Sequence, residues 1–353
     1  MNAADHPILA DDLLLVNKPN QTENSGWMPC PCKLPTWRHF LIAPRSITRT
    51  NRYYSTVSRD GDGRGIELLD DTPRTIRDFL TPSRVSLLDL ILQPYLPPAL
   101  QDIRYKSTEL PPAYHFLFFP TSTSELDTLP DGYERHFAPK HSFKRRLWTQ
   151  GRLQFGCQSL RMASWGKCDE KILRVSGDEK GTDVWMERQI GPSSQASGEW
   201  SIRELRCLRY QREIRDVEEL NGLGPGAEML ATDCILKHTF TPSRILLTRY
   251  SYLTHNFHRI HIDPDYARSV ERYPDVLVHG PLSVTLILTM WSRSCISRGD
   301  PIALKSVKYV MYRPLYVNDP TTITITATKS GRKRAILWNN HNQKAVECII
   351  NSS

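Results

Sequence analysis

Apolar positions along the chain form helix-like and strand-like patterns. Apolar side chains fall on one face of residues 82–92, which predicts a helix, and we expect residues 75–80 to be helical as well. The apolar run at 115–119 fits either a buried central helix or the edge of a strand. A stronger apolar run at 281–290 follows Gly280 and predicts a buried helix.

Most of the remaining chain predicts antiparallel strands. In the first half, strands are expected from Lys140 onward, and turns rich in glycine and serine separate them between residues 171 and 210. A polar stretch with three glycines, residues 216–228, predicts a linker. The strands expected after this linker are 305–312, 321–327, 335–338 and 345–350.

Candidate chemistry gathers just before the apolar helix. His255, His258 and His261 recur every third residue, and Asp263-Pro264 then supplies an N-cap and a first residue for a short helix. We therefore expect the histidines in the loop before that helix. Gly280 stands at the start of the next helix, where free backbone N–H groups are suited to stabilising an oxyanion.

Composition narrows the classes of function. A chain of 353 residues can hold two domains, and it has no uninterrupted apolar run of about 18 residues that would predict a membrane-spanning helix. The net charge of +8 suits an acidic partner, but no basic patch is dense enough to predict nucleic-acid binding. A basic cluster either docks such a partner or forms a solvated surface: Lys140, Lys144, Arg145, Arg146 and Arg152.

The cysteines predict reduced and mostly buried thiols. Only Cys30 and Cys32 are close together among the eight, and the other six have no paired spacing typical of a metal site.

The N-terminal region has the composition of a targeting sequence. Residues 28–54 contain five bases and no acid, which is typical of a mitochondrial presequence, whereas residues 1–27 contain four acids and one base. We therefore expect the natural start at Met28, with residues 1–27 as an upstream extension. The alternative is a basic leader without targeting value.

Several motifs resemble one enzyme family. The string N-x-H-R-I-H-x-D-x-x-Y-A from Asn256, followed by L-V-H-G-P-L from Leu277, resembles the hydratase 2 (MaoC-like) hot-dog enzymes. The likeness is greatest to the mitochondrial 3-hydroxyacyl-thioester dehydratase type 2 branch. LPPAYHFLFFP from Leu110 and LPDGYERHFAP from Leu129 resemble the first half of that branch, so the resemblance spans roughly residues 66–350.

The resemblance implies an α+β double hot-dog, in which an antiparallel sheet wraps around a central helix in each of two repeats. The repeats are expected at 66–215, without catalytic function, and at 228–352, with the hydratase motif. Such a chain is either a homodimer or a pseudo-dimeric monomer. No cofactor, metal, membrane or nucleic acid is implied.

The resemblance also assigns residue roles. In the family, an Asp and a His five residues later activate the water, and here Asn256 and His261 occupy these positions. Because an amide cannot take up a proton at neutral pH, His261 is expected to be the base and Asn256 to orient water. The N–H of Gly280 is expected to hold the thioester carbonyl. Residues expected to bind substrate are His258, Arg259 and His279.

The implied reaction is reversible dehydration of an (R)-3-hydroxyacyl thioester to a trans-2-enoyl thioester. The thioester is expected to be carried by acyl carrier protein, and the reaction is expected to belong to fatty acid synthesis in the mitochondrial matrix. One alternative is a hydratase acting on a coenzyme A ester or a secondary-metabolite intermediate, and another is a non-catalytic thioester-binding subunit. A last hypothesis makes His255, His258, His261 and Asp263 metal ligands, although their expected loop position disfavours it.

Overall fold

A computed structural model describes residues 65–120, 123–194, 199–214 and 234–352. The expected upstream extension at 1–27, the presequence at 28–54 and the linker at 216–228 lie outside the described residues.

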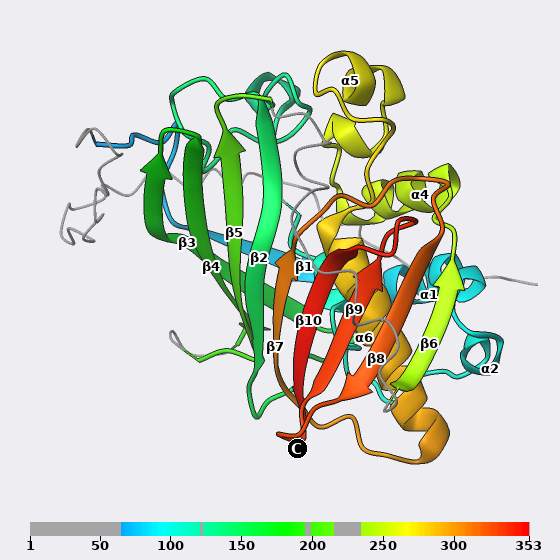
Figure 1. Ribbon diagram of the computed structural model, residues 1–353. Helices are drawn as coiled ribbons and strands as arrows, with labels where there is room; N and C mark the ends of the chain where they lie inside the picture. The colour runs from blue at the N-terminus through cyan, green and yellow to red at the C-terminus, as the bar shows by residue number, and fades with distance from the viewer. Residues whose placement is uncertain (1–64, 121–122, 195–198, 215–233, 353) are drawn as a thin grey trace, which may run out of the picture. The chain divides into compact units, whose positions relative to one another are not determined.

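One antiparallel sheet of ten strands organises this part of the chain (Figure 1). Its strand order is β1-β3-β4-β5-β2-β7-β10-β9-β8-β6, so the first five strands of the sequence fill one half and the last five fill the other. The strands of the first half are β1 (Arg74–Phe79), β2 (Arg145–Phe155), β3 (Trp165–Asp178), β4 (Gly181–Pro192) and β5 (Ile202–Gln211). Those of the second half are β6 (Cys234–Phe240), β7 (Leu304–Met311), β8 (Thr321–Ala327), β9 (Lys333–Trp338) and β10 (Lys344–Ser352).

The two halves of the sheet join where β2 pairs with β7. Gly151 of β2 lies opposite Tyr309 of β7 in this pairing. A Cβ on Gly151 would come within 2.2 Å of the Tyr309 hydroxyl, so only glycine leaves room for this buried tyrosine. The four strands predicted in the second half are confirmed as β7, β8, β9 and β10.

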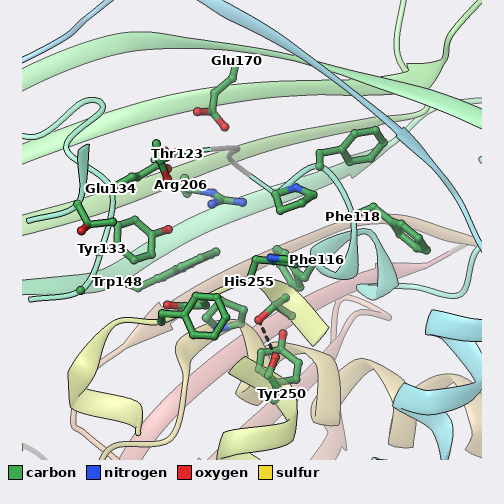
Figure 2. A pocket seen from close by; sticks show the side chains of 18 of the residues that line it. Phe116, Phe118, Thr123, Tyr133, Glu134, Trp148, Glu170, Arg206, Tyr250 and His255 are labelled. Atoms are coloured by element: carbon green, nitrogen blue, oxygen red, sulfur yellow. Dashed lines mark hydrogen bonds between the residues drawn. The ribbon is translucent and has the colours of Figure 1, made fainter. Parts of the chain in front are cut away.

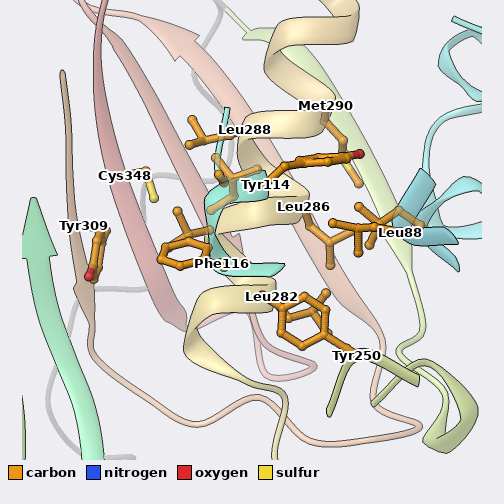
Figure 3. Packing of buried hydrophobic residues seen from close by; sticks show 14 of the residues in the cluster. Leu88, Tyr114, Phe116, Tyr250, Leu282, Leu286, Leu288, Met290, Tyr309 and Cys348 are labelled. Carbon is orange, nitrogen blue, oxygen red and sulfur yellow. The ribbon is translucent and has the colours of Figure 1, made fainter. Parts of the chain in front are cut away.

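Helix α6 (Gly280–Arg298) is the long central helix of the second half. It extends beyond the predicted 281–290 and ends where Gly299 adopts a positive φ of 76°. Its apolar side chains pack against β10 and against aromatic residues from elsewhere, including Tyr114, Phe116 and Tyr250 (Figure 3). A continuous apolar cluster therefore links both halves through this helix.

The apolar run at 115–119 forms only the short 3-10 helix η2 (Tyr114–Leu117). Prolines at 111, 112 and 120 flank it, and the positive φ values of Ala113 and Phe119 turn the backbone at both ends. The run at 115–119 therefore does not form the central helix that one of its two interpretations predicted, although η2 is buried in the core.

Residues 75–80 were expected to be helical, but they form strand β1, which pairs with β3. Burial alternates along β1, as a period-two pattern requires, and the short segment is closed by Thr81-Pro82. The neighbouring prediction is confirmed: α1 spans Pro82–Leu92, and the Thr81 hydroxyl caps it by accepting a hydrogen bond from Arg84 N–H.

The other helices lie at the ends of the strands and around the core. They are η1 (Gln93–Tyr95), α2 (Pro98–Gln101), η3 (Glu125–Asp127), α4 (Arg244–Thr254), η4 (Arg259–His261) and α5 (Pro264–Ser269). None of the helices in the described ranges has the length and apolar character needed to cross a membrane.

Candidate active site

The loop between α4 and α5 carries the predicted histidine motif. Helix α4 ends at Thr254, and the next residue, His255, has a φ of 51° that turns the chain out of the helix. The Asn256 side-chain oxygen then accepts a hydrogen bond from His258 N–H at 3.2 Å. Asp263 caps α5 by accepting from the backbone N–H groups of Asp265 and Tyr266. The sequence prediction of histidines in a loop before a capped helix is confirmed, with His261 in the single turn η4.

His261 is buried, and its tautomer follows from its hydrogen bond. Its Nδ1 lies 2.8 Å from the Leu277 carbonyl oxygen, which can only accept, so Nδ1 carries the proton. In the neutral ring Nε2 therefore carries the lone pair. Burial, together with the nearby His258, lowers the pKa of His261 to about 3, so the ring is neutral at physiological pH.

His279 supports the His261 ring from behind. The two rings are stacked with centroids 3.8 Å apart and an interplanar angle of 24°. His279 is fully buried, and its Nε2 lies 2.8 Å from the Ser251 hydroxyl. Burial and the neighbouring histidines lower the pKa of His279 well below its ordinary value. The structure thus places this predicted substrate-binding residue in contact with His261 rather than on a cavity wall.

A cavity of about 180 Å³ lies in front of His261. We call it the histidine cavity. Residues of both halves line it, and they include Tyr133, Arg146, Trp148, Asn256, His258, His261, Gly280 and Met311. Four of the predicted site residues therefore meet at one cavity, although they come from three different elements. Gly280 is the first residue of α6, where backbone N–H groups have no partner within the helix.

A second cavity of about 310 Å³ adjoins the first (Figure 2). Tyr133, Trp148, Asn256 and Pro281 line both cavities. Figure 2 shows Phe116 and Tyr250 on the walls of this adjoining cavity, together with the charged side chains of its first-half strands. Among those charged side chains, Arg206 is paired with buried Glu204 at 2.6 Å.

Two carboxylates that the sequence analysis did not single out lie beside His258. Its Nε2 is 3.7 Å from Asp131 Oδ2 and 3.7 Å from Glu271 Oε1, and all three side chains are buried. Asp131 also forms an ion pair with Arg146 Nε at 3.1 Å. Asp131 is 127 residues and Glu271 is 13 residues from His258 in sequence, so no local spacing relates them to it. Asp131 does lie in the string LPDGYERHFAP, which resembles the first half of the family branch.

Arg259 lies apart from the histidine cavity. Its guanidinium pairs with Asp263 at 2.8 Å, stacks over the Tyr266 ring and remains 44% exposed. This geometry gives it a role in holding the loop, and the prediction that it binds substrate has no support from its position.

Two of the five residues in the predicted basic docking cluster are buried, and the other three are exposed. Arg145 and Arg146 are 1% and 4% exposed, because Arg145 donates to the Glu271 carbonyl and Arg146 pairs with Asp131. They cannot form part of a docking surface. Lys140, Lys144 and Arg152 are exposed.

The structure also bears on the thiols and on the metal hypothesis. Cys168, Cys207, Cys295 and Cys348 are buried free thiols, whereas Cys157 and Cys234 are exposed.

No group of three His, Cys, Asp or Glu side chains within the described ranges is arranged to hold a metal ion. The hypothesis that His255, His258, His261 and Asp263 are metal ligands is therefore wrong; His255 is exposed at the end of α4.

The fold and the site together define a class of protein. The structure is similar to a MaoC-like dehydratase of Phytophthora capsici, with a TM-score of 0.56 and 14% identity over 81% of this chain and 96% of that one. It is also similar to a Mycobacterium tuberculosis protein described as having a double hot-dog fold, with a TM-score of 0.50, 10% identity and coverage of 80% and 96%. The class is that of the double hot-dog proteins, as predicted.

Sequence comparison narrows the class. Residues 113–317 match the family model of hydroxyacyl-thioester dehydratase type 2. The mitochondrial hydroxyacyl-thioester dehydratase type 2 of Schizosaccharomyces pombe is 31% identical over 272 residues, which cover 72% of this chain and 90% of that protein. The chain belongs to the hydroxyacyl-thioester dehydratase type 2 family. It is therefore a hydro-lyase.

Proposed function

We propose that the chain interconverts (R)-3-hydroxyacyl and trans-2-enoyl thioesters at the histidine cavity. The observation that carries this proposal is the fixed tautomer of His261: the Leu277 carbonyl holds the proton on Nδ1, and the ring lines the cavity that Gly280 also lines. A neutral imidazole and a free helix N-terminus are the base and the oxyanion donor that this reaction needs.

In the dehydration direction, Nε2 of His261 takes the proton from C2 of the substrate. The C2–H electron pair forms the C2=C3 double bond, while the C3–O bond breaks and the hydroxyl leaves as water after gaining a proton. Negative charge builds on the thioester oxygen, where the Gly280 N–H stabilises it. This charge also favours the imidazolium that forms on His261, which offsets the low basicity caused by burial.

Asn256 has a positioning role in this scheme. Its oxygen fixes the loop through His258 N–H, and its side chain lines both cavities. The amide group orients the water or hydroxyl but exchanges no proton. We place the thioester near the boundary of the two cavities, where Asn256 and Pro281 lie.

The carrier and the location are also proposals. We infer an acyl carrier protein substrate in the mitochondrial matrix, supported by the mitochondrial relative and by the exposed bases Lys140, Lys144 and Arg152. Residues 66–215 and 228–352 would be the two repeats, consistent with the division of the sheet between β5 and β6.

The decisive experiment is hydration of trans-2-enoyl thioesters of several lengths, carried by acyl carrier protein and by coenzyme A. His261→Ala should reduce turnover by about 10²–10⁴-fold, the usual contribution of a general base. His341→Ala is the matched control, because His341 is exposed and remote from the cavity lining. An unchanged rate in His261→Ala would exclude His261 as the base, and binding without any turnover by the unmodified chain would favour a non-catalytic subunit.

A further inference from the structure

Elimination of water requires two proton transfers, and His261 accounts for only one. The base removes the C2 proton, but hydroxide leaves C3 poorly unless an acid protonates it. Asn256 cannot be that acid, although the resemblance to the hydratase 2 (MaoC-like) enzymes implies a carboxyl group at its position. Among the residues that line the histidine cavity, His258 and His261 are the only two whose ordinary pKa lies near neutrality.

His258 has the surroundings of a proton-transfer group. Its Nε2 faces Asp131 and Glu271 at 3.7 Å each, while the ring forms part of the cavity wall. Carboxylates beside one imidazole nitrogen fix the orientation of the ring, so Nδ1, the other nitrogen, is left to meet the substrate. The other titratable or charged neighbours are His261 at 5.6 Å between ring centroids, Tyr133 at 6.0 Å, and Arg146 through its ion pair with Asp131.

The contact between Asp131 and His258 is built into the backbone. The Asp131 carbonyl accepts a hydrogen bond from Arg259 N–H at 2.8 Å, which ties the first-half loop to the histidine loop. Next to it, Gly132 has a φ of 78°, and a Cβ there would lie 2.6 Å from the Phe257 carbonyl oxygen. Only glycine permits this close approach, so the two loops are held together at this point.

We propose that His258, held between Asp131 and Glu271, is the general acid that protonates the departing 3-hydroxyl group. This inference rests on the proposed function and adds a second catalytic residue, with Asp131 and Glu271 as its positioning residues. The first half of the chain would then supply, through Asp131, part of the carboxylate function that Asn256 lacks.

The step balances without any further reactant. Nε2 of His261 accepts the C2 proton with its lone pair. The electron pair of the broken C2–H bond becomes the C2=C3 π bond, and the pair of the broken C3–O bond goes to oxygen. That oxygen takes the proton from Nδ1 of His258, the nitrogen that does not face the carboxylates, and leaves as water, so His258 ends neutral and His261 ends protonated. Release of the His261 proton and reprotonation of His258 through water in the cavity restore the starting state. Hydration runs the same steps in reverse.

A change of leaving group separates the acid from the base. With a 3-chloroacyl thioester, chloride leaves as an anion and needs no proton, whereas removal of the C2 proton is still required. His258→Gln should therefore reduce dehydration of the 3-hydroxyacyl thioester by about 10²-fold, a usual general-acid contribution, and leave elimination from the 3-chloroacyl thioester unchanged. His261→Ala should reduce both reactions by about 10²–10⁴-fold, each measured above its uncatalysed rate.

Asp131→Asn tests the positioning role by the same pair of substrates. Turnover of the 3-hydroxyacyl thioester should fall by about 10-fold with little change in KM, since a positioning residue acts through the acid and not through binding. Asp127→Asn is the matched control: it removes the same charge from the same loop, but Asp127 is 51% exposed and pairs with Arg135. Thermal melting of each variant establishes that it is folded.

If His258→Gln lowers both eliminations equally, or changes neither, the inference is overturned, because a structural role does not depend on the leaving group. An unfolded Asp131→Asn protein does not block the test, because His258→Gln probes the same step. If the unmodified chain dehydrates no 3-hydroxyacyl thioester, the proposed function itself fails; an active chain with a normal His258→Gln variant overturns this inference alone.

Discussion

At the residue scale, the chemistry of the site depends on which ring nitrogen carries a proton. The Leu277 carbonyl fixes the proton of His261 on Nδ1, and the stacked His279 ring limits its rotation. Asn256 fixes the next turn through His258 N–H. These contacts lie within the histidine loop or join it to Leu277 and His279, just before α6. A few residues therefore determine the geometry of the base.

Asn256→Asp provides a test of how close this side chain lies to the base. The carboxylate can still accept the His258 N–H, so the turn should survive, but its charge would stabilise the His261 imidazolium and raise the pKa of His261 from about 3. The acid limb of the kcat profile should therefore move to higher pH. Asn342→Asp, at an exposed turn, should leave the profile unchanged. An unmoved limb in Asn256→Asp would contradict a direct interaction with His261.

Sequence reasoning at this scale succeeded where the signal was local. The His261 position, the Asp263 cap and Gly280 at a helix start all follow from spacing or from the family motif. Asp131 could not be predicted, because it meets His258 only when the two halves fold together, and Glu271 could not be predicted, because it lies beyond α5 at no spacing that relates it to His258. His279 and Arg259 lie in the motif, yet packing directs one behind His261 and the other toward Asp263.

At the element scale, helix α6 supplies both the core and one part of the site. Its buried length anchors the second half of the sheet, and its first residue opens on the histidine cavity. Trp148 and Met311 approach Gly280 so closely that a Cβ there would lie 3.3 Å and 3.5 Å from their side chains. A side chain at position 280 would therefore narrow the cavity beside the free N–H group.

Comparing Gly280→Pro with Gly280→Ala isolates the contribution of the N–H group. Both variants add a Cβ beside Trp148, but only proline removes the hydrogen-bond donor, and proline is well tolerated at the first position of a helix. Gly280→Pro should turn over about 10²–10³-fold more slowly than Gly280→Ala, the usual effect of one oxyanion donor. Steady-state kinetics and melting temperatures provide the comparison, and equal rates would remove the N–H of Gly280 from the mechanism.

Predictions of secondary structure failed where a segment was too short for its apolar pattern to distinguish a helix from a strand. Residues 75–80 have too few positions to separate helix from strand, and pairing with β3 decided the outcome. The run at 115–119 is apolar enough for a central helix, but its flanking prolines and the positive φ at Ala113 and Phe119 confine it to one turn. Tertiary contacts and backbone stereochemistry decided these cases.

At the scale of the whole described fold, the two halves share one core and one site. Strands β2 and β7 pair at the junction, η2 of the first half packs in the cluster around α6, and Asp131 of the first half faces His258 of the second. The first half is therefore part of the site's architecture, although the family motif lies in the second. This arrangement buries neutral histidines in both halves, namely His115, His261 and His279.

These histidines make stability depend on pH. Burial lowers the pKa of His115 to about 4 and that of His261 to about 3, against 6.5 in the unfolded chain. Below pH 6.5 the unfolded state therefore binds more protons than the folded state, so the free energy of unfolding is greatest above pH 6.5 and decreases as the pH falls toward the folded pKa values. His115 and His261 should each lower the free energy of unfolding by about 2 kcal/mol at pH 5 relative to pH 7.5.

The dependence can be assigned by substitution at His115, which lies outside the lining of both cavities. Chemical denaturation at pH 7.5 and pH 5 should show a smaller loss of stability for His115→Gln than for the unmodified chain, because one proton-binding site of the unfolded state is gone. His341→Gln is the matched control at an exposed position, and it should retain the full loss. An equal loss in all three proteins would mean that His115 is not held neutral by the fold, and that the acid sensitivity arises from other groups.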